Sequence, residues 1–79
     1  MTSNDNILGI IWWDDEDGRH YRCRGFGLKY RYFYDRWIKN SSYRCTDEDW
    51  PWDYFVFDDP NDHERLIKEF PGDVWEDKV

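Results

Sequence analysis

The sequence predicts a small α+β domain, in which an antiparallel sheet of three to four strands carries one C-terminal α-helix. Short apolar segments bounded by turn residues predict the strands, and a late segment with helical periodicity predicts the helix. The 79 residues include 6 Trp, 6 Tyr and 5 Phe, which bury enough area per side chain to give a short chain a core. We expect a single domain over residues 1–79, with 1–6 and 73–79 flexible or loosely docked.

The first two strands are expected to form a hairpin. Residues 7–13, ILGIIWW, are β-branched and aromatic, and this unbroken apolar run predicts burial on both faces of the strand. Asp17-Gly18 is a pair that suits a tight turn. Residues 20–26 then form the returning strand. Gly25 and Gly27 near its end predict a bulge or a bend.

Residues 28–39 fit two interpretations. Alternation along 28–34 favours a strand, and Tyr and Phe are better strand formers than helix formers. Helical spacing is also present, at Tyr30, Phe33, Tyr34, Trp37 and Ile38. We predict a strand over 28–34, with a helix as the alternative.

The last strand and the helix have the clearest signals. Residues 46–51 are acidic and predict an irregular loop, and residues 52–57, WDYFVF, predict a strand. A helix is expected over 60–70, with Asp59 as its N-cap and Pro71-Gly72 as its stop. Its buried stripe is expected to consist of His63, Leu66, Ile67 and Phe70. Glu64 and Lys68 are spaced to form a supporting ion pair.

Charge is distributed unevenly along a chain whose net charge is −7. Residues 1–17 carry −5, residues 18–45 carry +7, and residues 46–79 carry −9. The acidic balance argues against a general affinity for nucleic acid or anionic membranes, and it suits a basic protein surface. No apolar run is long enough for a membrane span or a signal peptide, so we expect a cytoplasmic protein.

Two acidic segments form the predicted partner-binding site. Trp50 and Trp52 stand among carboxylates, as an aromatic anchor stands inside a polar rim at protein interfaces. Self-repulsion makes such clusters either solvated loops or surfaces for a basic partner. The predicted contact residues are Asp14, Asp15, Glu16, Asp17, Asp47, Glu48, Asp49, Trp50, Trp52 and Asp53.

A basic and aromatic stretch over residues 19–36 supports the alternative, a nucleic-acid-binding module. Its aromatic rings could stack bases while its cations meet phosphates. The candidate contacts are Arg22, Arg24, Lys29, Tyr30, Arg31 and Tyr32. Because the flanking segments are acidic, we expect Arg22, Arg24 and Arg31 to pair with carboxylates of the same chain. If these arginines instead lie on an exposed surface away from carboxylates, nucleic-acid binding becomes the better interpretation.

No catalytic or cofactor motif is present, so we expect neither an enzyme nor a cofactor. The chain's His and Cys residues are His20, Cys23, Cys45 and His63, and they lack the Cys-x-x-Cys spacing typical of zinc sites. We therefore predict no metal. Whether the two cysteines are free, bridged or metal-bound stays open.

These features together predict a small binding protein that inhibits a larger partner, such as a nuclease or another nucleic-acid-binding protein, by occupying its basic site. In size and charge the chain is similar to phage-encoded inhibitors of host defence nucleases, including anti-CRISPR proteins. It is also similar to bacterial immunity proteins against nuclease toxins. A phage origin would place it in the host cytoplasm. A structural or assembly protein that self-associates through its exposed aromatics is the remaining alternative.

Overall fold

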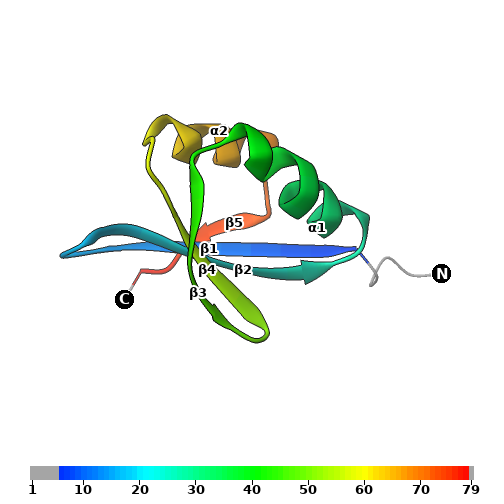
Figure 1. Cartoon of the computed structure of the whole chain (residues 1–79), viewed down its shortest axis with the longest axis horizontal. Helices are drawn as coiled ribbons and strands as arrows, with labels where there is room; N and C mark the ends of the chain where they lie inside the picture. Colours follow the sequence, from blue (N-terminus) through cyan, green and yellow to red (C-terminus); the bar gives the residue numbers. More distant parts are fainter. Residues whose placement is uncertain (1–5, 79) are drawn as a thin grey trace.

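The computed structural model describes residues 6–78, which form one five-stranded sheet with helices on one side of it (Figure 1). The strand order is β3-β4-β2-β1-β5. The elements are β1 (Ile7–Asp15), β2 (Gly18–Phe26), α1 (Leu28–Tyr32), β3 (Tyr43–Asp49), β4 (Trp52–Phe57), α2 (Asn61–Glu69) and β5 (Val74–Glu76). The α+β class is confirmed. The prediction that residues 1–6 are flexible falls, for residues 1–5, outside the described part of the chain.

The hairpin of β1 and β2 forms as predicted. Its two strands are antiparallel and pair without interruption from Ile7 opposite Phe26 to Asp15 opposite Gly18. Gly18 has a φ of 117°, which a residue with a side chain rarely adopts, so glycine is needed where the turn ends. No bulge interrupts this pairing at Gly25, and the predicted bend instead lies at Gly27, whose φ is 92°.

The prediction of a strand over 28–34 is wrong, because this segment is helical. Beyond α1 the chain continues through a π-helical segment, Phe33–Trp37, and a 3₁₀ turn, Ile38–Asn40. The helix places Phe33 and Trp37 on one side, where both are buried. In a strand these two side chains would share a face but lie about 13 Å apart along it, whereas one helical turn brings the Phe33 and Trp37 rings to a centroid distance of 5.7 Å. Tertiary burial of the helical stripe therefore overrides the strand propensity of its tyrosines.

The sheet is also larger than the predicted three to four strands, and it is mixed. Residues 46–51 were expected to be irregular, but most of them belong to β3, which pairs antiparallel with β4. A bulge between Cys45 and Asp47 lets the acidic part of β3 keep pairing, and an edge position leaves its carboxylates in water. β5 adds a parallel edge next to β1.

Aromatic side chains fill the space between the helices and the inner face of the sheet, which we define as the face that the helices cover. Phe55 lies at its centre, stacked between the rings of Tyr21 and Tyr43 at centroid distances of 5.0 and 4.7 Å. The buried core residues are Leu8, Ile10, Tyr21, Cys23, Phe33, Trp37, Phe55, Leu66 and Phe70. The predicted core of sheet and helix is therefore present, with a second helical segment in the same layer.

The predicted C-terminal helix is confirmed over Asn61–Glu69, one residue shorter at each end than expected. The N-cap position is taken by Pro60 and not, as predicted, by Asp59, whose carboxylate nevertheless accepts a hydrogen bond from the Asn61 N–H at 2.9 Å. Ile67 was expected in the buried stripe but is 41% exposed, and Glu64 and Lys68 form no ion pair. His63 is buried and lies 2.8 Å from the Tyr21 hydroxyl. Burial lowers the pKa of His63 and raises that of Tyr21 to about 12.

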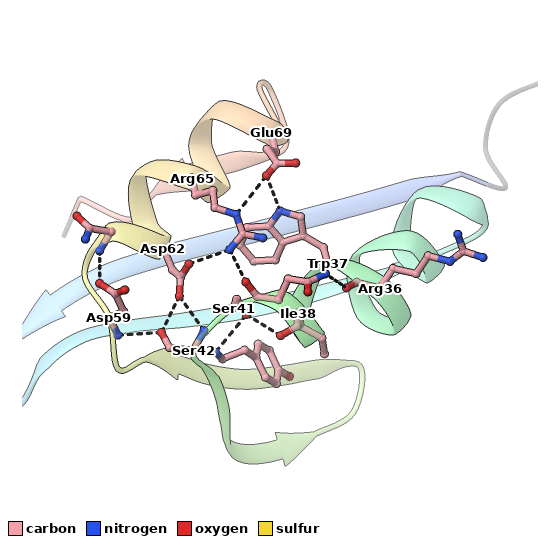
Figure 2. Close-up of polar contacts among 12 residues, drawn as sticks. Arg36, Trp37, Ile38, Ser41, Ser42, Asp59, Asp62, Arg65 and Glu69 are labelled. Atoms are coloured by element: carbon pink, nitrogen blue, oxygen red, sulfur yellow. Dashed lines mark hydrogen bonds and ion pairs between the residues drawn. The ribbon is translucent and has the colours of Figure 1, made fainter.

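Asp62 connects α2 to the end of the other helical segment (Figure 2). Its carboxylate accepts hydrogen bonds from the backbone N–H and the hydroxyl of Ser42, each at 2.7 Å, and from Arg65 at 2.9 Å. Arg65 in turn donates to the Asn40 carbonyl at 2.7 Å and lies over the Trp37 ring. Burial opposes the charge on Asp62, but these donors outweigh it and lower the pKa of this carboxyl.

We predict that Asp62→Asn lowers the free energy of unfolding by about 2 kcal/mol, because the Ser42 and Arg65 donors would lose a charged acceptor in a buried site. Urea denaturation measures the change. Asp58→Asn is the matched control, since Asp58 pairs with Arg44 on the surface, and it should cost less than about 1 kcal/mol. Equal effects of the two substitutions would contradict the connecting role of Asp62.

Candidate functional site

Within residues 6–78, no layer of secondary structure covers the face of the sheet opposite the helices (Figure 1). Strand alternation and register assign its side chains. We call this set the open face: Ile7, Ile11, Trp13, His20, Arg22, Arg24, Phe26, Arg44, Trp52, Tyr54, Val56 and Trp75. The predicted burial of residues 7–13 on both faces is therefore wrong. Leu8 and Ile10 are buried on the inner face, whereas Ile11 and Trp13 are only partly covered by their neighbours.

Two arginines of the open face lie against one tryptophan ring. The guanidinium carbons of Arg22 and Arg24 are 4.5 and 4.9 Å from the centre of the Trp52 ring. Neither arginine forms an ion pair with a carboxylate of residues 6–78, and the buried Nε of Arg22 has no hydrogen-bond partner there. Arg31, on α1, has no such ion pair either. The prediction that these arginines pair with the chain's own acids is wrong for the described residues.

The tip of the β3–β4 hairpin, residues 47–50, projects away from the rest of the molecule (Figure 1). Trp50 is 92% exposed, the largest exposure among the described large apolar side chains. Asp47, Glu48 and Asp49 precede it and are exposed, and no cation of residues 6–78 pairs with them. An indole in water beside three unneutralised carboxylates is therefore the most prominent feature of this hairpin tip.

Alternation divides the predicted site at 47–53 between the two sides of the hairpin. Asp47 and Asp49 lie opposite Tyr54 and Trp52, and therefore on the open-face side. Glu48 lies opposite Asp53, and both side chains belong to the inner side, toward α1. The bulge after Cys45 determines which of these residues point to which side of the hairpin. Residues predicted as one contact site are therefore two groups with different surroundings.

A cleft lies between α1 and the hairpin, where β2 runs past the end of its pairing with β4 at Cys23, and side chains from both faces of the sheet line it. It consists of two adjoining hollows with volumes of about 880 and 770 Å³. Both are lined by Gly25, Phe26, Tyr30, Glu48 and Asp53. A methyl group added at Gly25 would collide with the Ile7 carbonyl and approach Tyr30 to 3.0 Å. Glycine at this position therefore lets the Tyr30 ring lie against the strand.

The second predicted acidic cluster, residues 14–17, forms the turn between β1 and β2. Asp14 binds Arg19 at 2.8 Å, and Asp15 lies 3.0 Å from the His20 Nε2. The Arg19 hydrogen bond lowers the pKa of Asp14, and the backbone N–H of Asp17 lowers that of Asp15. Unlike residues 47–49, Asp14 and Asp15 already lie against the chain's own bases. The two acidic clusters also occupy different projections of the molecule (Figure 1).

The alternative nucleic-acid site does not form one surface. Arg22 and Arg24 lie on the open face, whereas the other four candidates belong to α1. Lys29 pairs with Asp73 at 3.2 Å, and the Tyr30 hydroxyl donates to Asp53 at 3.1 Å. Tyr32 is 47% exposed and its ring lies beside Phe70. Of the six predicted nucleic-acid contacts, only Arg22 and Arg24 therefore lie on the open face.

Metal-ligand side chains converge once within residues 6–78, at Asp15, Asp17 and His20, whose ligand atoms lie within 4.8 Å of one another. Hydrogen bonds of the turn already use the Asp15 carboxylate. Cys23 and Cys45 are free thiols, and burial raises the pKa of Cys23 to about 12. His20 and Cys23 face opposite sides of β2. In the part of the chain described, no helix has both the length and the apolar character needed to cross a membrane.

Comparison with protein-family models, with curated proteins and with solved structures finds no match for this chain. The site is therefore argued from its own geometry. That geometry adds apolar and aromatic residues that sequence reasoning missed, among them Ile11, Trp13, Tyr54 and Trp75. The signal for Ile11 and Trp13 was the unbroken apolar run at 7–13, because a strand with one covered face presents half of such a run to solvent.

We predict that Trp50→Ala changes the free energy of unfolding by no more than about 0.5 kcal/mol, because the indole contacts little of its own chain. Trp37→Ala, which removes a buried ring between the two helices, should cost about 3–5 kcal/mol. Thermal and urea unfolding of both variants check this contrast. A large loss of stability in Trp50→Ala would mean that Trp50 has a structural role.

Proposed function

We propose that this chain is a small binding protein that inhibits a larger protein by docking the β3–β4 hairpin tip on a basic surface. The observation that carries the proposal is Trp50, 92% exposed and preceded by three carboxylates that have no cationic partner in residues 6–78. Tryptophan is enriched among the residues that dominate binding energy, and burying its ring in a partner removes a large apolar area from water.

The charges around Trp50 support a basic partner. Carboxylates at the rim of an interface accelerate encounter with a positive surface and disfavour other partners. The net charge of −7 acts in the same direction. Asp47 and Asp49 lie opposite Tyr54 and Trp52, so these two acids are continuous with the open face, and Trp50 follows them at the tip.

Inhibition follows from the nature of strongly basic protein surfaces, which commonly bind phosphates. A protein that covers such a surface excludes nucleic acid from it by steric and electrostatic competition. The proposed partner is therefore a nuclease or another nucleic-acid-binding protein. An anti-defence inhibitor encoded by a phage and an immunity protein against a nuclease toxin are the two forms of this proposal.

The partner protein is first isolated by its affinity for the immobilised wild-type chain, and its binding to three variants then tests the proposal. Trp50→Ala should weaken binding by at least about thirtyfold, the loss typical of a central anchor. The double variant Asp47→Lys/Asp49→Lys should weaken binding and flatten its dependence on salt. Glu64→Lys/Asp77→Lys changes the net charge equally at exposed sites elsewhere and is the matched control. Calorimetry or surface plasmon resonance at low and high salt measures all three.

The partner's nucleic-acid binding is the second readout. Wild-type chain should displace an oligonucleotide from the partner, and Trp50→Ala should not. If Trp50→Ala and the Asp47/Asp49 variant bind like wild type, the hairpin tip is not the contact surface.

A second function, single-stranded nucleic-acid binding on the open face, is favoured by one observation. Arg22 and Arg24 lie across Trp52 without any ion pair to residues 6–78, which leaves their charges available to phosphates. Aromatic rings interleaved with arginines are the usual platform for stacked bases. The acidic hairpin tip beside this platform is what ranks the function second.

Fluorescence anisotropy with single-stranded and duplex oligonucleotides separates the two functions. The inhibitor proposal predicts no binding at moderate salt, since a chain of net charge −7 repels the phosphate backbone. Tight, salt-dependent binding that Arg24→Gln reduces would establish the second function instead. Lys39→Gln, which removes an exposed charge elsewhere, is the control.

A further inference from the structure

The cleft between α1 and the β3–β4 hairpin has an anionic and aromatic centre. The residues common to its two hollows include Phe26 and Tyr30 as rings and Glu48 and Asp53 as carboxylates. No base is common to both hollows, because Arg31 borders only the larger one and Arg24 only the smaller. A cation at the centre would therefore meet two carboxylates and two rings, with the cleft's own bases at its outer ends.

Glu48 and Asp53 form an unfavourable pair in the free protein. They lie directly opposite each other on β3 and β4, a position that brings Cβ atoms to about 5 Å. Like charges in this position destabilise a sheet. No cation of residues 6–78 pairs with either carboxylate, and the one side-chain donor to Asp53 is the neutral Tyr30 hydroxyl, at 3.1 Å. The fold thus retains a repulsive pair that a bound cation would neutralise.

We propose that this cleft binds the side chain of an arginine on the partner protein, an inference that rests on the proposed function and adds a second contact to it. The guanidinium group is planar and carries five N–H donors, so it can bridge two carboxylates while it lies against an aromatic ring. Phe26 is 52% exposed and offers such a ring at the cleft wall. A lysine ammonium could pair with one carboxylate at a time but could not stack in this way.

The test is an NMR titration of the ¹⁵N-labelled chain with three peptides, acetyl-Gly-Arg-Gly-amide and its lysine and citrulline analogues. Citrulline keeps the shape of arginine without its charge. The arginine peptide should shift the amide signals of Gly25, Phe26, Glu48 and Asp53, and it should bind more tightly than both analogues. In Glu48→Gln/Asp53→Asn the affinity should fall about tenfold or more.

Glu64→Gln/Asp77→Asn is the matched control, since it removes the same charge at exposed sites away from the cleft, and it should leave the affinity within about twofold. Glu48→Gln by itself should raise the melting temperature, because it relieves the repulsion. If a double variant does not fold, the affinities of the wild-type chain for the arginine and citrulline peptides still test the proposal. Equal affinity for the lysine or citrulline peptide, or shifts centred on residues 14–17, overturns the proposal.

The same variants separate this inference from the proposed function. Suppose that the isolated partner binds Glu48→Gln/Asp53→Asn as tightly as wild type but binds Trp50→Ala much more weakly. The proposed function of the hairpin tip then stands, and the proposed cleft contact is wrong. If the arginine peptide binds the cleft but neither set of variants changes the affinity for the partner, the cleft is a real site and the proposed function of the hairpin tip is wrong.

Discussion

Coverage of the sheet on one face is the constraint on which the rest of the structure depends. The two helical segments supply Phe33, Trp37, Leu66 and Phe70, and these close the inner face into a dry aromatic core. Within residues 6–78, no further helix or strand covers the other side. The apolar and aromatic residues that strand alternation places there are therefore left half-exposed, a feature typical of interaction surfaces.

That constraint holds only while the two helical segments stay together over the sheet. Asp62 fixes the end of one to the start of the other through Ser42 and Arg65, and the Trp37 indole donates to Glu69 at 3.1 Å (Figure 2). These polar contacts lie at the edge of the core, where buried donors and acceptors must be satisfied. One hydrogen bond, from the Tyr30 hydroxyl, ties α1 to Asp53 of the β3–β4 hairpin. Within residues 6–78, Asp47, Asp49 and Trp50 at the tip make no side-chain hydrogen bond or ion pair to another element, so they are available to a partner.

Sequence reasoning found the elements whose signals are local. The apolar run and the Asp17-Gly18 turn predicted β1 and β2, and the Asp59-Pro60 start and Pro71-Gly72 stop predicted α2 to within one residue at each end, although Pro60 and not Asp59 is its N-cap. The helix at 28–40 could not be read in this way, because tyrosine propensity favoured a strand and only burial of Phe33 and Trp37 decides for a helix. Likewise, the bulge after Cys45 decides that Glu48 faces the inner side and Asp49 the open-face side, and no composition argument reveals on which side of a hairpin each acid lies.

The six tryptophans report directly on the claim that one face is covered and the other is free. Their indole N–H signals can be recorded with a neutral paramagnetic agent in solution. The account predicts strong broadening for Trp50, which is 92% exposed, clear broadening for Trp75 at 53%, and none for Trp37 at 2%. Broadening of Trp37 would contradict the helical layer. Protection of Trp50 and Trp75 in the free chain would mean that the surface is already occupied by a second copy, as expected for an assembly protein.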